Sequence, residues 1–137
     1  MAKRIVLISC ASKKCAQRTK AKDLYISTLF RFNLKYAYSL KPDAVFILSA
    51  KYGLLDLDAE IEPYNVTLNK MTSQENRRWA TLVIDALGER FDLKKDHFVF
   101  LAGNQYRKNL ISAISSYEVP LNGLSIGRQL QFLRKAI

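Results

Sequence analysis

Three residues of this chain carry side chains that can break a bond at a sugar carbon: Lys51, Asp56 and Glu62. A lysine amine that is removed from water has a lowered pKa and can attack a sugar carbon to form a Schiff base. A carboxylate can position water or stabilise the positive charge that develops on the sugar ring. We therefore predict that these three residues are catalytic. The alternative for Lys51 is a phosphate contact or an ion pair with Asp56 or Glu62.

Further residues can line a pocket for a base or another small substrate. Tyrosine rings stack on bases, and hydroxyl and amide groups hydrogen-bond to base edges. A nucleophilic cysteine would need an activating base, and no histidine accompanies Cys10, so we assign Cys10 to the pocket. The predicted pocket residues are Ser9, Cys10, Ser49, Tyr52, Tyr64, Asn104 and Tyr106.

Basic residues near the start of the chain are suited to bind phosphate. Residues 1–41 contain ten lysine and arginine residues and one acidic residue, whereas the other 96 residues carry a net charge of +1. Such a block attracts a phosphate backbone through electrostatic steering and counterion release, although it can also be a solvated face that only aids solubility. The loop lacks the glycines of a Walker motif. The predicted phosphate contacts are Ser12, Lys13, Lys14, Lys20 and Lys22.

Many of these residues follow apolar runs that are typical of buried parallel strands. The runs at residues 4–9, 44–49 and 98–101 show no polar alternation, which indicates burial on both faces of a sheet. The carboxyl ends of parallel strands meet at one edge of the sheet, where open α/β sheets bind ligands. We therefore expect the polar residues at the three strand ends to form one site. Three unrelated strand ends with polar loops are the alternative.

Helical spacing of apolar residues predicts the elements that connect the strands. Helices are expected around residues 24–40, 72–90, 106–116 and 125–135, and residues 11–22 are expected to form a polar loop. Asp23 is the expected N-cap of the first helix, and Thr72 with Glu75 forms a capping box at the second. Strands separated by helices predict an α/β fold, a three-layer sandwich with a small, mostly parallel sheet of three to four strands flanked by helices. Residues 1–137 form a single domain.

Composition limits the class of protein further. No apolar run approaches the roughly 20 residues of a membrane span, and the chain begins with a short basic segment rather than a signal peptide, so we expect a cytoplasmic protein without membrane contact. The two cysteines, Cys10 and Cys15, are too few for a disulfide framework, and no metal site or cofactor is expected. The single histidine, His97, lies at the start of a strand and receives no catalytic role.

Several blocks of the sequence together resemble a known family. The chain resembles the bacterial and phage proteins of the domain of unknown function 6884, which look distantly related to YaaA-type DNA-binding proteins and share features with enzymes of modified-base metabolism. The matching blocks are Ser9-Cys10 with Lys13-Lys14, Asp23-Leu24-Tyr25, Ser49-Ala50-Lys51-Tyr52-Gly53, Glu62-Pro63-Tyr64 and Leu121-Asn122-Gly123-Leu124-Ser125. The resemblance implies nucleic-acid or nucleotide chemistry, including cleavage or exchange of an N-glycosidic bond.

The sequence therefore predicts a protein that acts on nucleic acid, with DNA favoured over RNA. The first hypothesis is a DNA N-glycosylase, or a related enzyme of the base–sugar bond, that acts on a modified base. The second is a DNA-binding module without catalysis, which explains the basic block without the carboxylates. The third is an enzyme that processes nucleotides or nucleosides and uses the basic block for a free phosphate.

Overall fold

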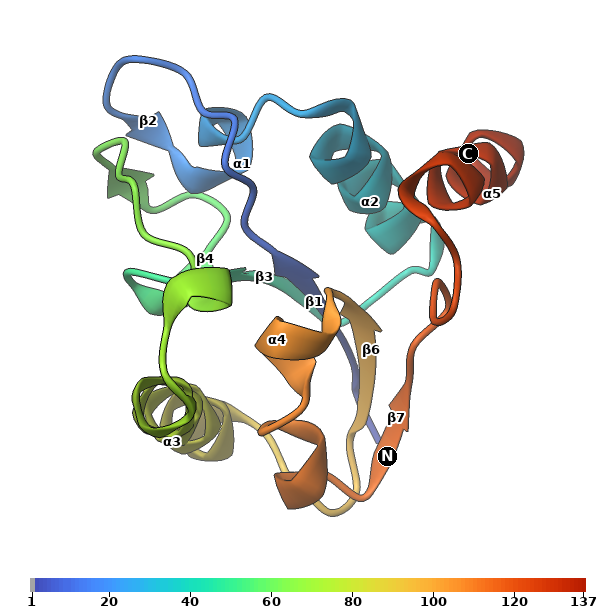
Figure 1. Cartoon of the computed structure of the whole chain (residues 1–137). Coiled ribbons are helices and arrows are strands. Elements are labelled where there is room, and N and C mark those ends of the chain that lie inside the picture. The colour runs from blue at the N-terminus through green and yellow to red at the C-terminus, as the bar shows by residue number, and fades with distance from the viewer. Residues whose placement is uncertain (1) are drawn as a thin grey trace.

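The computed structural model describes residues 2–137 and shows a five-stranded sheet between two layers of helices (Figure 1). The order across the sheet is β4-β3-β1-β6-β7, and of these five strands β4 alone runs antiparallel to its neighbour. The α/β class predicted from the sequence is confirmed. The strands are β1 (Arg4–Ser9), β3 (Ala44–Ser49), β4 (Gly53–Asp56), β6 (His97–Leu101) and β7 (Ser116–Glu118).

The three central strands are apolar throughout because helices cover both faces of the sheet. Successive side chains of β1 alternate between the faces, with Ile5 and Leu7 in one core and Val6 and Ile8 in the other. All four of these side chains are fully buried. The continuous apolar runs at residues 4–9, 44–49 and 98–101 therefore form the expected parallel strands.

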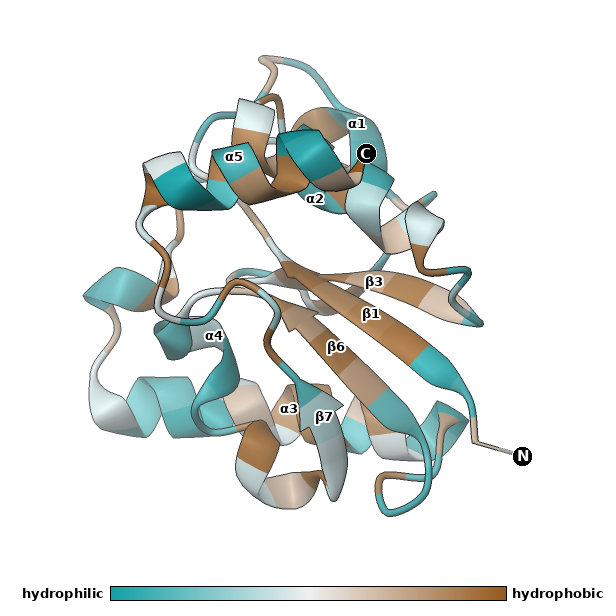
Figure 2. Cartoon of the chain, turned by 90° about the vertical axis from the view of Figure 1, so that its right-hand side faces the viewer, coloured by the Kyte–Doolittle hydropathy of each residue, from teal (hydrophilic) through white to brown (hydrophobic). Residues whose placement is uncertain are grey.

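The helices divide into two layers, which Figure 2 shows above and below the brown central strands. One layer contains α1 (Ala21–Leu24), α2 (Thr28–Ser39) and α5 (Ile126–Ala136). The other layer contains α3 (Ser73–Arg90), α4 (Asn104–Arg107) and the 3₁₀ turns η1 (Leu68–Lys70) and η2 (Ile111–Ala113). The predicted capping box is confirmed, since Thr72 accepts from the Glu75 N–H and Glu75 accepts from the Thr72 N–H.

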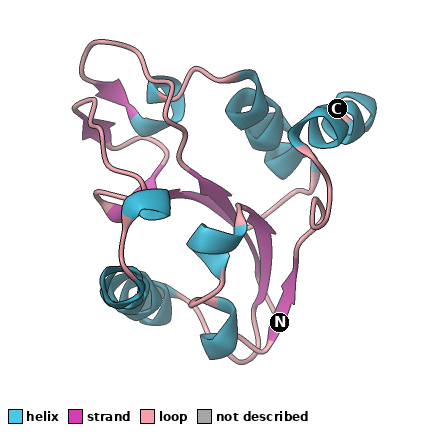
Figure 3. Ribbon diagram, in the orientation of Figure 1, coloured by secondary structure: helices cyan, strands magenta, loops and turns pink. Residues whose placement is uncertain are grey.

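A second, two-stranded sheet lies beside the main one and joins distant parts of the chain (Figure 3). It pairs β2 (Thr19–Lys20) with β5 (Glu60–Ile61) in antiparallel register. Backbone bonds from the N–H groups of Ala21 and Lys22 to the carbonyls of Ala59 and Leu57 continue this pairing. The basic loop at residues 11–22 is therefore attached to the segment after β4.

The expected number of three to four strands is wrong, because the main sheet has five. The chain turns back directly after β3, and Gly53 adopts a positive φ of 73° in this turn. A left-handed conformation of this kind costs glycine little. The following residues pair antiparallel with β3, so that Asp56 lies opposite Phe46. A strand of four residues is too short to show a clear period in the sequence, so β4 is not among the predicted strands.

The expected first helix at 24–40 is also wrong at its start. The chain forms the short helix α1, leaves helical geometry at Tyr25, and begins α2 only at Thr28. Ser27 caps α2 by accepting from the Phe30 N–H, so Asp23 is not the cap. This break leaves Tyr25 outside both helices.

The C-terminal third follows the prediction in part. The helix expected at 106–116 is replaced by α4, the turn η2 and the edge strand β7. The expected closing helix is confirmed as α5, with Ser125 accepting from the Arg128 N–H at its start.

Candidate functional site

The three predicted strand ends do meet at one edge of the sheet. In the paired register, Ser9 of β1 lies beside Leu48 of β3, and Ile8 lies beside Leu101 of β6. The Cys10 N–H continues this pairing by donating to the Leu48 carbonyl at 3.0 Å. The carboxyl ends of β1, β3 and β6 therefore form a common edge, which is where open α/β sheets place ligands.

Three hydroxyl groups form a connected cluster at this edge. Tyr64 Oη lies 2.8 Å from Ser49 Oγ and 2.5 Å from Tyr25 Oη. Ser49 Oγ also accepts from the N–H groups of Lys51 and Tyr52, which holds the turn after β3 in place. Ser49, Tyr64 and Tyr25 have one hydroxyl hydrogen each, and the two hydrogen bonds among them use two of these hydrogens. The third hydrogen can therefore bond to a ligand. We call Ser49, Tyr64 and Tyr25 the hydroxyl cluster.

A thiol and a fourth hydroxyl lie beside this cluster. Cys10 Sγ is 3.4 Å from Tyr106 Oη, and Tyr106 Oη also accepts from the Leu68 N–H at 3.5 Å. The Tyr106 ring packs edge-on against Trp79, whose indole N–H donates to the Ser49 carbonyl. Trp79 is buried, so it supports the strand end rather than stacking on a substrate.

Burial keeps the tyrosines of this edge protonated. It raises the pKa of Tyr25 and of Tyr64 well above the ordinary tyrosine range, and it raises the pKa of Tyr106 to about 12. At neutral pH all three are therefore neutral hydroxyls. Such groups can donate a hydrogen bond to an anionic or electron-rich ligand atom.

Lys14 brings a positive charge to the same edge. Its Nζ lies 4.5 Å from the centroid of the Tyr64 ring and 5.8 Å from that of Tyr25. Nζ also donates to the Ser12 carbonyl at 3.3 Å. Within residues 2–137 no carboxylate forms an ion pair with Lys14. The side chain is half-buried, and this burial lowers the pKa of Lys14.

Backbone contacts fix the loop that carries Lys14. Lys14 and Tyr25 form an isolated antiparallel bridge, and the N–H groups of Cys15 and Ile26 donate to the carbonyls of Leu24 and Lys13. The start of the predicted polar loop is therefore ordered against the chain around Tyr25.

The two predicted catalytic carboxylates lie outside the hydroxyl cluster. Asp56 is on β4, three residues back from the carboxyl edge, and forms an ion pair with Arg90 at 3.2 Å. Glu62 forms an ion pair with Arg18 at 3.5 Å. Their side chains are 63% and 60% exposed, so both carboxylates are solvated. The alternative of an ion pair between Lys51 and Asp56 or Glu62 is therefore wrong, because both carboxylates pair with arginines.

Lys51 also lacks the burial that the Schiff-base hypothesis requires. Its side chain is exposed, and its Nζ lies 5.4 Å from the centroid of the Tyr52 ring. Tyr52 is 39% exposed and packs edge-on against Tyr64. Tyr52 is thus an accessible ring beside the hydroxyl cluster, as a stacking residue would have to be.

The predicted phosphate contacts separate into two groups. Ser12 and Lys13 are exposed in the loop that carries Lys14. Lys20 and Lys22 instead face Asp58, with Nζ to Oδ1 distances of 3.9 and 3.3 Å. Of the remaining pocket residues, Ser9 ends β1, and Asn104 is exposed at the start of α4.

Sequence reasoning missed Tyr25 as a member of the site. The residue was assigned to a helix because apolar spacing continues through it. The signal that could have placed it is Ser27, because a serine at a helix start favours the N-cap position and leaves the preceding residues outside the helix.

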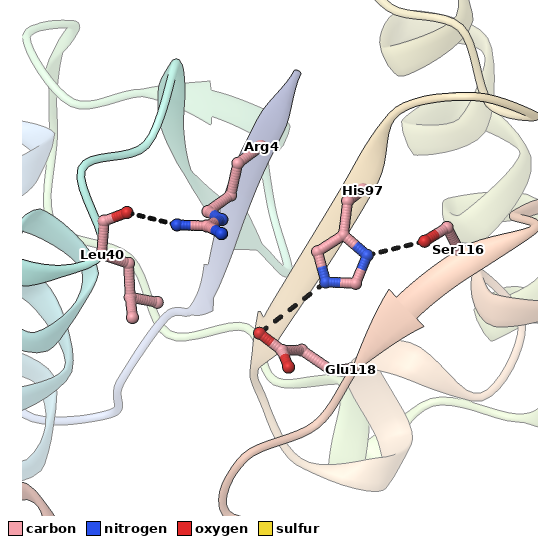
Figure 4. Close-up of polar contacts among 5 residues, drawn as sticks. All are labelled: Arg4, Leu40, His97, Ser116 and Glu118. Carbon is pink, nitrogen blue, oxygen red and sulfur yellow. Dashed lines mark hydrogen bonds and ion pairs between the residues drawn. The ribbon is translucent and has the colours of Figure 1, made fainter. Parts of the chain in front are cut away.

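The single histidine lies at the opposite, amino edge of the sheet (Figure 4). His97 Nδ1 is 2.7 Å from Ser116 Oγ, and its Nε2 is 3.7 Å from Glu118. Arg4, across the strand pair, donates to the Leu40 carbonyl. These contacts join strand and helix ends and leave His97 remote from the carboxyl-edge cluster.

The fold and the edge cluster together define an α/β protein with a basic, hydroxyl-rich site at the carboxyl end of its sheet. The chain belongs to the family of unknown function DUF6884, whose pattern matches residues 5–135. No curated protein and no solved structure shows significant similarity to the chain. In residues 2–137, no helix is both long and apolar enough to span a membrane, and no group of three or more His, Cys, Asp or Glu side chains is placed to hold a metal ion.

Proposed function

We propose that the protein acts on nucleic acid at its carboxyl-edge site and breaks the bond between a base and its sugar. The observation that carries this proposal is Lys14, a half-buried cation without a carboxylate partner in residues 2–137, placed against the hydroxyl cluster. A partly desolvated charge is costly unless it is compensated. An anionic substrate would supply the missing counter-charge, and a nucleotide is such a substrate.

The surrounding groups match the parts of a nucleotide. Ser12 and Lys13 are exposed beside Lys14 and are available for phosphate oxygens. The exposed ring of Tyr52 offers a stacking surface for a base that has left its duplex. The free hydrogen of the hydroxyl cluster can bond to a base edge.

A DNA-binding module without catalysis is the second candidate function. The specific observation in its favour is that Asp56 and Glu62 lie outside the hydroxyl cluster, in ion pairs with Arg90 and Arg18. A site without a carboxylate cannot use the usual two-carboxylate route of glycoside hydrolysis. An enzyme that processes free nucleotides would use the same cation and hydroxyls. Its affinity for substrate would depend on salt much less than the affinity of a duplex-binding protein does.

Base release is the direct test. The protein is incubated with bacterial genomic DNA and with phage DNA that carries modified bases, and half of each sample is treated with alkali before a denaturing gel. Alkali-dependent strand breaks, together with a free base identified by mass spectrometry, are the expected result. DNA that remains intact while shifting on a native gel would instead support the binding module. A protein with this function would work in the cytoplasm, where bacterial DNA is located.

A further inference from the structure

We infer that Lys14 is the nucleophile of this site and attacks the sugar carbon C1′ of the bound nucleotide. The inference rests on the proposed function and names the group that performs it. It replaces the carboxylate mechanism, because neither Asp56 nor Glu62 reaches the hydroxyl cluster.

Geometry distinguishes Lys14 from the other lysines near the edge. Lys13 and Lys51 are exposed, and Lys20 and Lys22 lie within ion-pair distance of the Asp58 carboxylate. Lys14 is half-buried, and its backbone is fixed by the bridge to Tyr25.

Burial also gives Lys14 the protonation state that the reaction needs. An amine attacks only when it is unprotonated, and burial lowers the pKa of Lys14, which increases the neutral fraction. The Tyr64 ring 4.5 Å away favours the ammonium form, so the effect of burial has to exceed this attraction. The nearby Cys10 sulfur also favours the ammonium form, but burial has the larger effect, so the pKa of Lys14 is lowered. No carboxylate in residues 2–137 pairs with Lys14, and the exposed Ser12 and Lys13 hold the phosphate oxygens while the neutral fraction of Lys14 attacks.

The reaction balances with the groups at this edge. The lone pair of Nζ forms a bond to C1′ while the C1′–N bond to the base breaks, and the base leaves with that electron pair and takes up a proton. Water supplies that proton, because the raised pKa of Tyr64 makes its hydroxyl a weak acid. The hydroxyl cluster can hydrogen-bond to the departing base through its free hydrogen. Nζ, now bonded to C1′, then loses a proton. Its lone pair opens the C1′–O4′ bond, O4′ takes up a proton, and an iminium forms between Nζ and C1′. Water hydrolyses the iminium and frees the lysine.

An oligonucleotide duplex with one abasic site tests the amine without knowledge of the target base. The abasic aldehyde forms the same iminium with a lysine, and sodium borohydride reduces it to a stable protein–DNA complex seen on a denaturing gel. We expect wild-type protein to give this complex, with the linkage mapped by peptide mass spectrometry to Lys14. A linkage spread over exposed lysines, or mapped to Lys51, would overturn the inference.

Lys14→Arg is the decisive variant because it keeps the positive charge and cannot form an iminium. We expect it to bind the duplex within a few-fold of wild type, to lose the trapped complex, and to release base from the modified DNA at least about a hundredfold more slowly. The matched control is Lys94→Arg, an exposed lysine between α3 and β6, which should behave as wild type. Base release by Lys14→Arg at the wild-type rate would overturn the inference and leave the proposed function intact. No base release by the wild-type protein would overturn both.

Discussion

Lys14 and Lys51 differ in the burial of their side chains, and burial matters more for reactivity than position at a strand end. Lys51 follows β3 directly, as the sequence shows, but its side chain extends into solvent. Lys14 lies five residues after β1 in a polar loop, yet it packs on the rings of Tyr64 and Tyr25. Removal of water lowers the pKa of a lysine amine, which is why we infer that the loop lysine, Lys14, is the nucleophile.

Ser49 is the residue on which the hydroxyl cluster depends, and Ser49→Ala tests this role. The change leaves the N–H groups of Lys51 and Tyr52 and the hydroxyl of Tyr64 without their common partner. We expect a loss of about 1–3 kcal/mol in the free energy of unfolding, measured by urea denaturation. A variant as stable as wild type would show that water replaces the serine hydroxyl at no cost.

Lys41 is a position where a substitution should stabilise the protein. Lys41 directly follows Leu40, the C-cap residue of α2. Its φ of 51° is a left-handed conformation that glycine adopts more readily than lysine. We expect Lys41→Gly to raise the free energy of unfolding by about 0.5–1 kcal/mol, measured by urea or thermal denaturation. Lys35→Gly, in the exposed interior of α2, is the control and should lower it by about 1 kcal/mol. A loss in both variants would contradict this explanation.

At the scale of elements, one carboxylate joins the starts of β1 and β6. The buried Asp96 accepts from the N–H groups of Lys3 and Asp92, each at 2.8 Å. These two backbone donors lower the pKa of Asp96 in the folded protein. A lowered folded-state pKa means that this contribution to stability is complete above the unfolded-state pKa of about 4 and is lost as pH falls through the folded-state value.

Asp96→Asn therefore changes both stability and its pH dependence. We expect the variant to lose about 1–3 kcal/mol at pH 7, because the two N–H groups bond to different carboxylate oxygens and asparagine has only one acceptor oxygen, so one N–H loses its partner. Urea denaturation at pH 7, 4 and 3 should show that the difference from wild type shrinks at the lowest pH. Parallel pH profiles for the two proteins would mean that Asp96 has the same pKa in the folded and unfolded states.

The sequence predicts those elements whose pattern is local. The buried strands, the capping box of α3 and the helix after Ser125 all follow from adjacent residues. The meeting of Cys10 and Tyr106 at one edge follows from the rule that parallel strands share their carboxyl edge. The position of Asp56 does not follow, because it depends on a turn at Gly53 and on pairing with β3. The place of Tyr25 in the site depends on where α2 begins and on contact with Tyr64, 39 residues away.

At the scale of the whole molecule, the fold pairs three of the ten cations of the basic block with carboxylates. The first 41 residues supply most of the net charge of +10. The pairing of β2 with β5 brings acidic side chains from the segment after β4 against three of these cations. Arg18 pairs with Glu62, and Lys20 and Lys22 pair with Asp58. Lys13 and Lys14 of this block, and Lys51 after β3, form none of the ion pairs found in residues 2–137.

If the protein binds DNA as we propose, this pairing sets the salt dependence of the binding. Six to ten phosphate contacts, as the bare sequence suggests, would reduce affinity about a thousandfold or more between 50 and 200 mM salt. Contacts from only about three cations predict a loss of about 40-fold over the same range. Fluorescence anisotropy with a labelled duplex measures this loss directly.

Asp58→Asn gives the matched comparison, because it removes the acidic partner of Lys20 and Lys22. We expect the DNA affinity of this variant to fall more steeply with salt, as for about five phosphate contacts. A thousandfold loss already in wild type would mean that DNA displaces the acidic partners. That outcome is energetically accessible, since exposed ion pairs contribute only about 0–1 kcal/mol each. It would place Lys20 and Lys22 on the DNA and extend the binding surface from the carboxyl edge to the two-stranded sheet.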